Sequence, residues 1–417
     1  MSDPVVIVGA STAGLSVARE LRKLGYDASI QLIDGDADAP YRRPAVSKGV
    51  ISGAQSPADV AIPWPEALDL ERIAGTVTAL DLARRRVSAV GQDTEFELPF
   101  SQLVIATGSA ARPLPLPAPG GVLSLRDLVD GRVGCAALAE AEHVVIIGAG
   151  FIGLEVAASA RSLGKTVTVI ETAPAPLAHA VGATLGNHIA GIHRSHGVEI
   201  ICATQVRELR GGKRSEAVVL EDGRQIRADL VVAAVGSVPL VEWMRSSGVE
   251  LDNGLVCDRT CAAVGTDGVV GAGDIANWYN PLYERRMRVE HWTNAIEQGT
   301  YAAQRLLGKA DPRGFVSAPY FWSEQYHLRI QSIGSAAGHD AVCVLEHDGE
   351  TLVVAYGRAG VLIGVAGINA GPVIPRYRKR IEQREPFDVL AGLHAVEPGV
   401  AGGTPPHDDG QLADQRQ

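Results

Sequence analysis

The chain has 417 residues, which is enough for two or three domains rather than one core. With 46% hydrophobic and 21% charged residues, its composition is that of an ordinary globular α/β protein and not of a disordered or fibrous one. The formal net charge of -10 disfavours nucleic acid as a partner, because binding phosphates needs a surplus of Lys and Arg. The sequence contains no signal-peptide pattern and no apolar run long enough to cross a bilayer, so we expect a cytoplasmic protein with no membrane partner.

The cysteines give no sign of a disulfide framework or of a metal site. There are five, an odd number, and no two are spaced as CxxC, which favours reduced thiols. Cys257 and Cys261 are four residues apart, and an isolated pair of this kind is usually part of a core. We therefore predict no bound metal.

A strand, a glycine turn and a helix follow one another at about residues 4–34, in the sequence VVIVGASTAGLSVARELRKLGYDASIQLID. Dinucleotide-binding turns need Gly for the sharp bend, a small residue beside the pyrophosphate, and Gly where the helix packs on the strand. Gly9, Ser11 and Gly14 meet these requirements, with Ser in place of the usual middle Gly. The helix is predicted to end near Gly25.

The same pattern recurs at residues 143–171, in HVVIIGAGFIGLEVAASARSLGKTVTVIE. Here all three glycines are present, as Gly148, Gly150 and Gly153. Each turn is expected to hold a pyrophosphate on the N-terminal amides of the following helix, where the helix dipole favours an anion. Two such units predict two dinucleotide sites on two Rossmann-like domains.

A carboxylate should follow each turn by roughly twenty residues and bind the adenosine ribose. Glu171 fills this position in the second unit and is followed by Thr-Ala-Pro-Ala-Pro, without an Arg for a 2'-phosphate, so NADH is favoured over NADPH. In the first unit both Asp34 and Asp36 qualify, and the spacing does not separate them.

Other stretches outline the rest of the fold. The Pro-rich segment at 112–121 is typical of a crossing between domains, and residues 209–224 alternate as antiparallel strands do. Residues 352–369 predict a β-hairpin that turns at Gly360, followed by a basic segment, RYRKRIEQRE, and a helix. From about residue 397 the chain is polar, with few apolar residues, and we expect it to be disordered.

Two further segments, LVIATGS at 103–109 and VVGAGDIANW at 269–278, resemble those of the two-dinucleotide-domain flavoprotein reductases in both sequence and order. PYRRPAVSK at 40–48 and VEHWTNAIEQG at 289–299 resemble the FAD-dependent ferredoxin reductases that serve cytochrome P450 and Rieske oxygenase systems. The resemblance covers about the first 390 residues. It departs from the family pattern at Ala45 and Val46, where members usually have Pro and Leu, and at 34–36, where they have Gly-Asp-Glu.

This resemblance implies an α/β protein with an FAD domain at 1–112 and 246–316, an NAD domain at 113–245, a smaller α+β domain at 317–396, and a tail at 397–417. It also implies an enzyme that binds FAD tightly, takes a hydride from NADH and passes electrons singly to an iron-sulfur ferredoxin, as a monomer or homodimer. Other readings remain open: reduction of rubredoxin, of a small acceptor or of oxygen, or redox sensing.

Site residues follow from the resemblance by position. Lys48 is expected near the reactive edge of the flavin, with Glu155 as its acidic partner and Trp292 beside the flavin. The FAD-contacting positions are Ala13, Arg43, Lys48, Val77, Arg126, Asp274 and Trp292. We also assign to the nucleotide sites Ala106, Thr107, Gly108, Phe151, Ile152, Gly236 and Gly273. Basic clusters at 285–288 and 376–380 are candidates for docking an acidic ferredoxin.

Overall fold

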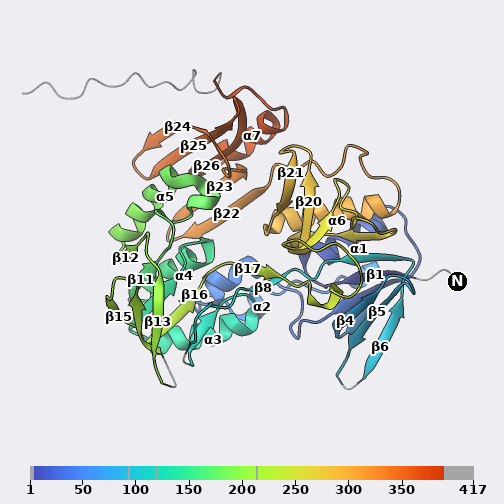
Figure 1. Cartoon of the computed structure of the whole chain (residues 1–417), viewed down its shortest axis with the longest axis horizontal. Coiled ribbons are helices and arrows are strands. Elements are labelled where there is room, and N and C mark those ends of the chain that lie inside the picture. Colours follow the sequence, from blue (N-terminus) through green and yellow to red (C-terminus); the bar gives the residue numbers. More distant parts are fainter. Residues whose placement is uncertain (1–3, 93, 119, 213–214, 389–417) are drawn as a thin grey trace, which may run out of the picture.

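The computed structural model of the chain describes residues 4–92, 94–118, 120–212 and 215–388 (Figure 1). Its framework is three five-stranded sheets, one in each of three lobes. Two of the sheets are parallel and carry helices, and the third is antiparallel. The chain therefore has the predicted α/β fold with two Rossmann-like units and a smaller C-terminal α+β domain. Among the described residues, no helix is long and apolar enough to cross a membrane.

The first parallel sheet has the strand order β19-β7-β1-β2-β3. These strands are β1 Val5–Val8, β2 Ile30–Asp34, β3 Glu71–Ala74, β7 Gln102–Ile105 and β19 Val269–Gly271. Every residue of β1 is buried, as expected for a continuous apolar run at the centre of a sheet covered on both faces. Because β19 lies beside β7, the chain returns to this sheet after passing through the second lobe.

Two helices pack against each other on the first sheet, α1 Thr12–Lys23 and α6 Trp292–Leu306. A side chain at Gly299 would place its Cβ 2.6 Å from the carbonyl oxygen of Ala13, so a glycine is needed where the helices cross. The first helix ends as predicted, with Gly25 at φ +84 just beyond it.

The second parallel sheet repeats this plan in the order β12-β11-β10-β16-β9. Its strands are β9 Val122–Ser124, β10 His143–Ile147, β11 Thr166–Ile170, β12 Val198–Ile201 and β16 Leu230–Ala233. The helices of this lobe are α3 Leu128–Glu140, α4 Phe151–Ser162 and α5 Ala178–Ser195. The predicted strand-turn-helix unit at 143–171 is thus present.

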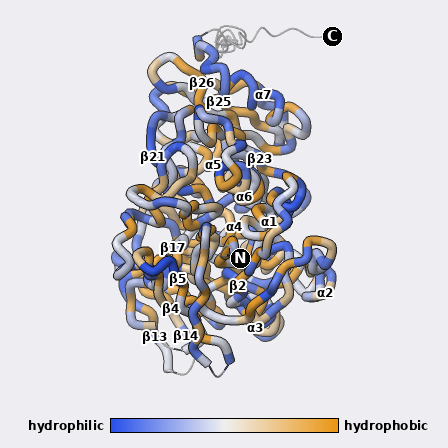
Figure 2. Tube along the Cα trace, turned by 90° about the vertical axis from the view of Figure 1, so that its right-hand side faces the viewer, coloured by the Kyte–Doolittle hydropathy of each residue, from blue (hydrophilic) through white to orange (hydrophobic). Residues whose placement is uncertain are grey.

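The C-terminal lobe is an antiparallel sheet of order β22-β23-β26-β25-β24 with one helix, α7 Val373–Glu382. Its strands are β22 Tyr320–Gln325, β23 Leu328–Gly334, β24 Ala341–Asp348, β25 Thr351–Arg358 and β26 Val361–Ile368. The predicted hairpin turns at Gly360, at φ +75. The basic segment does not precede a helix but forms α7 itself, whose trace is largely hydrophilic in Figure 2.

Smaller elements decorate the two nucleotide lobes. One antiparallel sheet consists of β4 Thr76–Asp81, β5 Arg86–Val90 and β6 Glu95–Pro99. A second consists of β13 Val206–Gly211, β14 Ser215–Leu220 and β15 Gln225–Arg227. A third is the pair β8 Ser109–Ala111 and β17 Ser237–Pro239. A mixed sheet holds β18 Leu255–Cys257, β20 Ala276–Asn280 and β21 Arg285–Arg288, and α2 is a single turn, Pro57–Val60. The predicted antiparallel strands at 209–224 are present, and the tail at 397–417 lies outside the described residues.

A buried histidine joins the second lobe to the C-terminal lobe. His193 lies on α5, is 1% exposed, and contacts the side chains of Gln325 and Tyr326 at 2.8 and 3.1 Å. Burial lowers the pKa of His193 to about 4. The imidazole is therefore neutral at physiological pH.

This pKa predicts an acid-sensitive fold. Unfolded His193 takes up a proton as the pH falls through about 6.5, whereas the folded chain resists protonation down to about pH 4. The free energy of unfolding should therefore be fully maintained above pH 6.5 and should fall by up to about 3 kcal/mol towards pH 4. Denaturant titrations at several pH values should show this slope reduced in His193→Gln. The exposed His179 of the same helix provides the control His179→Gln, and equal slopes in all three proteins would contradict the assignment.

Candidate active site

A continuous cleft runs along the carboxyl ends of the first sheet, the edge at which parallel sheets bind ligands. It consists of a wide part of about 1010 Å³ and a narrow part of about 260 Å³. The two parts share the lining residues Ser11, Arg43, Ala106, Thr107, Ser109 and Arg126. An elongated ligand can therefore occupy both parts at once.

The glycine turns at the two sheets are fixed by steric contacts of the same kind. A Cβ at Gly9 would lie 2.3 Å from the carbonyl oxygen of Ala106, and one at Gly148 would lie 2.3 Å from that of Ala234. A Cβ at Gly14 or Gly153 would come even closer, 1.9 or 2.1 Å, to the carbonyl of its own turn. The first and third glycines are thus required for the helix to pack on the strand.

The middle position of the turn is different. No atom lies within 4 Å of a Cβ built at Gly150, and the first turn has Ser11 at this place. Neither helix start is capped by a side chain, and neither has an acidic residue in its first turn. The N-terminal amides of α1 and α4 are therefore available to an anion on the open side of each turn.

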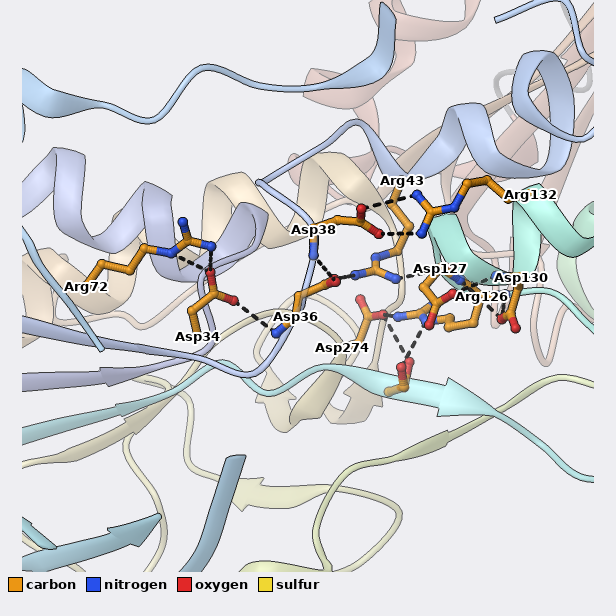
Figure 3. Close-up of polar contacts among 11 residues, drawn as sticks. Asp34, Asp36, Asp38, Arg43, Arg72, Arg126, Asp127, Asp130, Arg132 and Asp274 are labelled. Carbon is orange, nitrogen blue, oxygen red and sulfur yellow. Dashed lines mark hydrogen bonds and ion pairs between the residues drawn. The ribbon is translucent and has the colours of Figure 1, made fainter. Parts of the chain in front are cut away.

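The two aspartates that follow β2 have different surroundings (Figure 3). Asp34 is 5% exposed, and one of its carboxylate oxygens accepts two hydrogen bonds from Arg72, at 2.6 and 2.9 Å. Its other oxygen accepts from the backbone amide of Asp36 at 3.2 Å. Asp36 is more exposed and lies 3.6 Å from Arg43. Both carboxylate oxygens of Asp34 therefore have hydrogen-bond partners within the protein, whereas the carboxylate of Asp36 is more accessible to a ligand.

Glu171 also bonds to the protein backbone, at the second glycine turn. One carboxylate oxygen accepts from the amide of Ala149 at 2.7 Å, and the other accepts from the amide of Ala173 at 2.8 Å. These bonds hold the carboxylate directly after β11, beside the turn that contains Gly148 and Gly150.

A cluster of charges lies where the wide and narrow parts of the cleft meet (Figure 3). Arg126 donates to a carboxylate oxygen of Asp274 at 2.5 Å, and Ser109 donates to the same oxygen at 3.1 Å. Arg43 donates to the carbonyl oxygen of Arg126 at 2.9 Å. The cluster connects β8, the loop before α3 and the turn after β19, which places Asp274 at the cleft.

An ion pair with a buried carboxylate closes the narrow end. The Nζ atom of Lys48 lies 2.8 Å from Oε1 of Glu155, which is 5% exposed. Ser323 donates to the same carboxylate oxygen at 2.5 Å, and Ser47 donates to the other. The contact that the family resemblance implied between Lys48 and Glu155 is present, and the lysine is not a surface charge.

Aromatic side chains form the wall of the narrow end. Trp292, at the start of α6, lies here together with Phe151 from α4 and Phe321 and Trp322 from β22. The rings of Phe151 and Phe321 meet edge to face with centroids 4.5 Å apart. His291 lies against Phe321, and burial lowers its pKa to about 4, so this wall carries no charge from His291 at neutral pH.

The structure brings most of the predicted residues to this cleft. Its lining includes Gly9, Ser11, Ala13, Asp34, Asp36, Arg43, Lys48, Val77, Ala106, Thr107, Gly108, Arg126, Phe151, Ile152, Glu155, Gly273, Asp274 and Trp292. Outside the lining are Gly14, Gly148, Gly150, Gly153, Glu171 and Gly236. All of these except Gly14 belong to the second lobe, and Gly14 packs beneath the first turn.

Several lining residues were not predicted from the sequence. They are chiefly Ser47, Ser109, Trp243 and the aromatic run Tyr320, Phe321 and Trp322. Three consecutive aromatic residues in one strand are a signal that sequence analysis can use. Only the fold, however, shows that this strand of the third lobe reaches the first one.

The cleft has features of a site built for a polar, elongated ligand. The indole nitrogen of Trp243 in the wide part and Nδ1 of His291 in the narrow part are buried and have no hydrogen-bond partner among the described residues. Buried polar atoms normally have partners, so these two are suited to bond a ligand. Together with the free helix amides, they fit a dinucleotide.

Comparison with known proteins decides the family. Residues 3–299 match the model of the pyridine nucleotide-disulphide oxidoreductase family, and residues 320–392 match a reductase C-terminal domain. The chain belongs to the pyridine nucleotide-disulphide oxidoreductase family.

Relatives within this family are reductase components. The ferredoxin–NAD(+) reductase component of the anthranilate 1,2-dioxygenase system from Burkholderia cepacia is 34% identical, over 91% of this chain and 94% of its own length. Putidaredoxin reductase, solved in a covalent complex with putidaredoxin, has a TM-score of 0.86 at 30% identity, covering 93% of this chain and 95% of its own. The ferredoxin reductase of the CYP199A2 system from Rhodopseudomonas palustris gives 0.85 at 30% identity, covering 94% and 100%.

Although the family is named after disulfide chemistry, the described lining of this cleft contains no cysteine. Cys257 and Cys261 are buried in the core, and burial raises the pKa of the Cys257 thiol to about 12 and that of Cys261 well above its usual value. Thiols of this kind are unreactive. Within the described ranges, no group of three or more His, Cys, Asp and Glu side chains is arranged to hold a metal ion.

The steric difference within the second glycine turn predicts a matched pair of variants. Gly148→Ala should lower the free energy of unfolding by more than about 2 kcal/mol, because it forces a Cβ against the Ala234 carbonyl at φ +104. Gly150→Ala should stay within about 1 kcal/mol of wild type, because the space beside it is open. Denaturant unfolding followed by circular dichroism measures both, and equal losses would contradict this account of the turn.

Proposed function

We propose that this family member is an NADH-dependent ferredoxin reductase. It holds FAD tightly, takes a hydride from NADH and passes electrons singly to a small iron-sulfur ferredoxin that feeds a cytochrome P450 or a Rieske dioxygenase. The observation that carries this proposal is the single cleft that runs from the acids after β2 to the Lys48–Glu155 pair. The N-terminus of α4, the helix of the second nucleotide unit, reaches the cleft at that pair.

FAD would occupy the cleft with its adenosine half in the wide part. We assign the ribose to Asp36, because Asp34 already bonds to Arg72 and to the backbone. The pyrophosphate would bind the amides of α1 at the Gly9 turn. Val77 and Arg43 line this half, and Asp274, held by Arg126, would meet the ribityl chain.

NADH would bind the second unit, on the amides at the start of α4. Gly150 leaves room for the pyrophosphate, and Glu171 would accept hydrogen bonds from the ribose hydroxyls, which disfavours a 2'-phosphate at the same place. Phe151 and Ile152 would guide the nicotinamide into the narrow part of the cleft. In this assignment, residues 1–112 and 246–316 hold FAD and residues 113–245 bind NADH.

At the narrow end the protein supplies placement and charge. Bound FAD provides the redox chemistry, since it accepts two electrons as a hydride and releases them one at a time. Lys48 would present a fixed positive charge to the reactive edge, where negative charge develops on reduction. Glu155 orients the ammonium, and Trp292 limits the access of water. No cysteine is needed for this route.

The basic clusters at 285–288 and 376–380 stay candidates for docking ferredoxin, although part of their charge is paired within the polypeptide. Arg288 pairs with Glu290, Arg378 with Glu297 and Arg380 with Glu385. Arg286 donates to the carbonyl oxygen of Cys257. Three of the six arginines therefore have a carboxylate partner, whereas Arg285, Arg286, Arg376 and Lys379 have no ion pair among the described residues.

The proposed function predicts a defined order of reduction. The purified protein should be yellow, and anaerobic NADH should bleach the flavin at concentrations at least tenfold below those of NADPH. Glu171→Ala should narrow this preference, because the carboxylate that repels a 2'-phosphate is removed. Absorbance at the flavin band follows both titrations. A colourless protein that cannot be reconstituted with flavin would disprove the proposal.

Acceptor specificity is a separate prediction. Candidate ferredoxins should reoxidise the NADH-reduced protein faster than rubredoxin, quinones or oxygen, and turnover with an acidic ferredoxin should fall as ionic strength rises, because salt screens long-range attraction. Steady-state rates with each acceptor at several salt concentrations measure this. Preferential turnover of rubredoxin would favour the alternative function, rubredoxin reduction. Turnover that does not change with salt concentration would contradict electrostatic docking.

A further inference from the structure

A buried series of hydrogen-bonded side chains, here called the hydrogen-bond chain, extends from Glu155 away from the cleft to the interface between the second and third lobes. Ser323 donates to Glu155 at 2.5 Å, and the amide of Gln325 lies 3.2 Å from the Ser323 hydroxyl. Gln325 in turn contacts His193 at 2.8 Å, and His193 contacts the hydroxyl of Tyr326 at 3.1 Å. Ser323, Gln325 and His193 are at most 2% exposed.

The chemistry of Glu155 fixes the donor-to-acceptor direction of every bond in the hydrogen-bond chain. A carboxylate paired with Lys48 only accepts hydrogen bonds, so the hydroxyl of Ser323 must donate its single proton to Glu155. Towards Gln325 the serine hydroxyl can then only accept, and Gln325 must therefore present its NH2 group to Ser323. Its carbonyl oxygen consequently faces His193, whose Nε2 must carry the proton.

The same logic sets the state of His193. Burial lowers its pKa to about 4, so the ring is neutral and has only one N–H. With Nε2 protonated, Nδ1 is an acceptor and receives the hydroxyl proton of Tyr326. Every hydrogen bond from Tyr326 to Glu155 thus points the same way, towards the carboxylate. Hydrogen bonds aligned in this manner polarise and strengthen one another.

We propose that Ser323, Gln325 and His193 act as positioning residues that fix the carboxylate of Glu155 and, through it, the ammonium of Lys48. This inference rests on the proposed function for the role of Lys48 near the flavin. Neither Ser323 nor Gln325 lines the cleft, so both act through Glu155.

The residues of the hydrogen-bond chain come from two different lobes. Glu155 lies on α4 of the second lobe and His193 on α5, whereas Ser323 and Gln325 lie on β22 of the third lobe. Helix α4 contacts β22, and α5 contacts β25 and β26 of the same sheet (Figure 1). The strand that supplies Ser323 also supplies Phe321 and Trp322 to the cleft wall. The hydrogen bonds therefore fix the ion pair and this aromatic wall relative to each other.

The direction of the chain is testable without measuring activity. In ¹⁵N NMR spectra of the flavin-containing protein labelled at histidine, His193 should be neutral, with its proton on Nε2, at pH 7. Comparison with His193→Gln assigns the signals. Ser323→Ala removes the fixed end of the chain and should weaken this tautomer preference. A wild-type His193 that is charged, or that carries its proton on Nδ1, would overturn the proposal.

The effect on Lys48 is tested by the rate of flavin reduction. In anaerobic stopped-flow experiments, Ser323→Ala should slow reduction by NADH about tenfold, as expected when a charged group is displaced slightly. Its flavin content and affinity for NADH should remain those of wild type. Ser323→Thr keeps the hydroxyl and should restore the rate. The control is Ser332→Ala, a buried serine of the adjacent strand β23 with no part in the chain.

Gln325→Glu provides an independent test should Ser323→Ala fail to fold. The side chain keeps its shape but, as a carboxylate, cannot donate to Ser323, so the same slowing is expected. Wild-type rates in both Ser323→Ala and Gln325→Glu would refute the positioning role. If wild type itself holds no flavin or is not reduced by NADH, the proposed function fails instead, and the NMR result still decides whether the chain has the direction argued here.

Discussion

The ion pair between Lys48 and Glu155 is the interaction on which the arrangement of this molecule depends. The lysine follows the first nucleotide unit, the glutamate lies on the first helix of the second, and Ser323 of the third lobe bonds to the same carboxylate oxygen. A buried carboxylate such as that of Glu155 needs additional hydrogen bonds to its oxygens, because desolvation of a charge is costly. Placing the pair at the junction of three lobes makes its geometry sensitive to how all three are packed.

The cleft itself results from a backbone constraint. At Gly9 and Gly148 the turn lies so close to the neighbouring strand that no side chain fits, and at Gly14 and Gly153 the helix presses on the turn. This packing directs uncapped helix amides at open space. In the proposed function, these amides would bind the two pyrophosphates, and the carboxylates after the strands would bind the riboses.

Several charged side chains at the cleft have partners within the protein. Asp34 bonds to Arg72 and to the backbone, whereas Asp274, held by Arg126, lines the cleft. The same internal pairing changes the view of the basic segments: arginines that look available in sequence, such as Arg378 and Arg380, already have carboxylate partners.

The sequence by itself determined the two strand-turn-helix units and the hairpin at Gly360, because glycine turns and buried strands are local features with steric causes. Most of the predicted cleft residues came from the family resemblance instead. The sequence left Asp34 and Asp36 undecided, since their difference lies in Arg72, 38 residues further along the chain. It also missed Phe321, Trp322 and Ser323, and it did not show which arginines of the basic clusters pair with carboxylates. These depend on contacts between segments distant in sequence, such as β22 against α4, and only the tertiary structure brings such segments together.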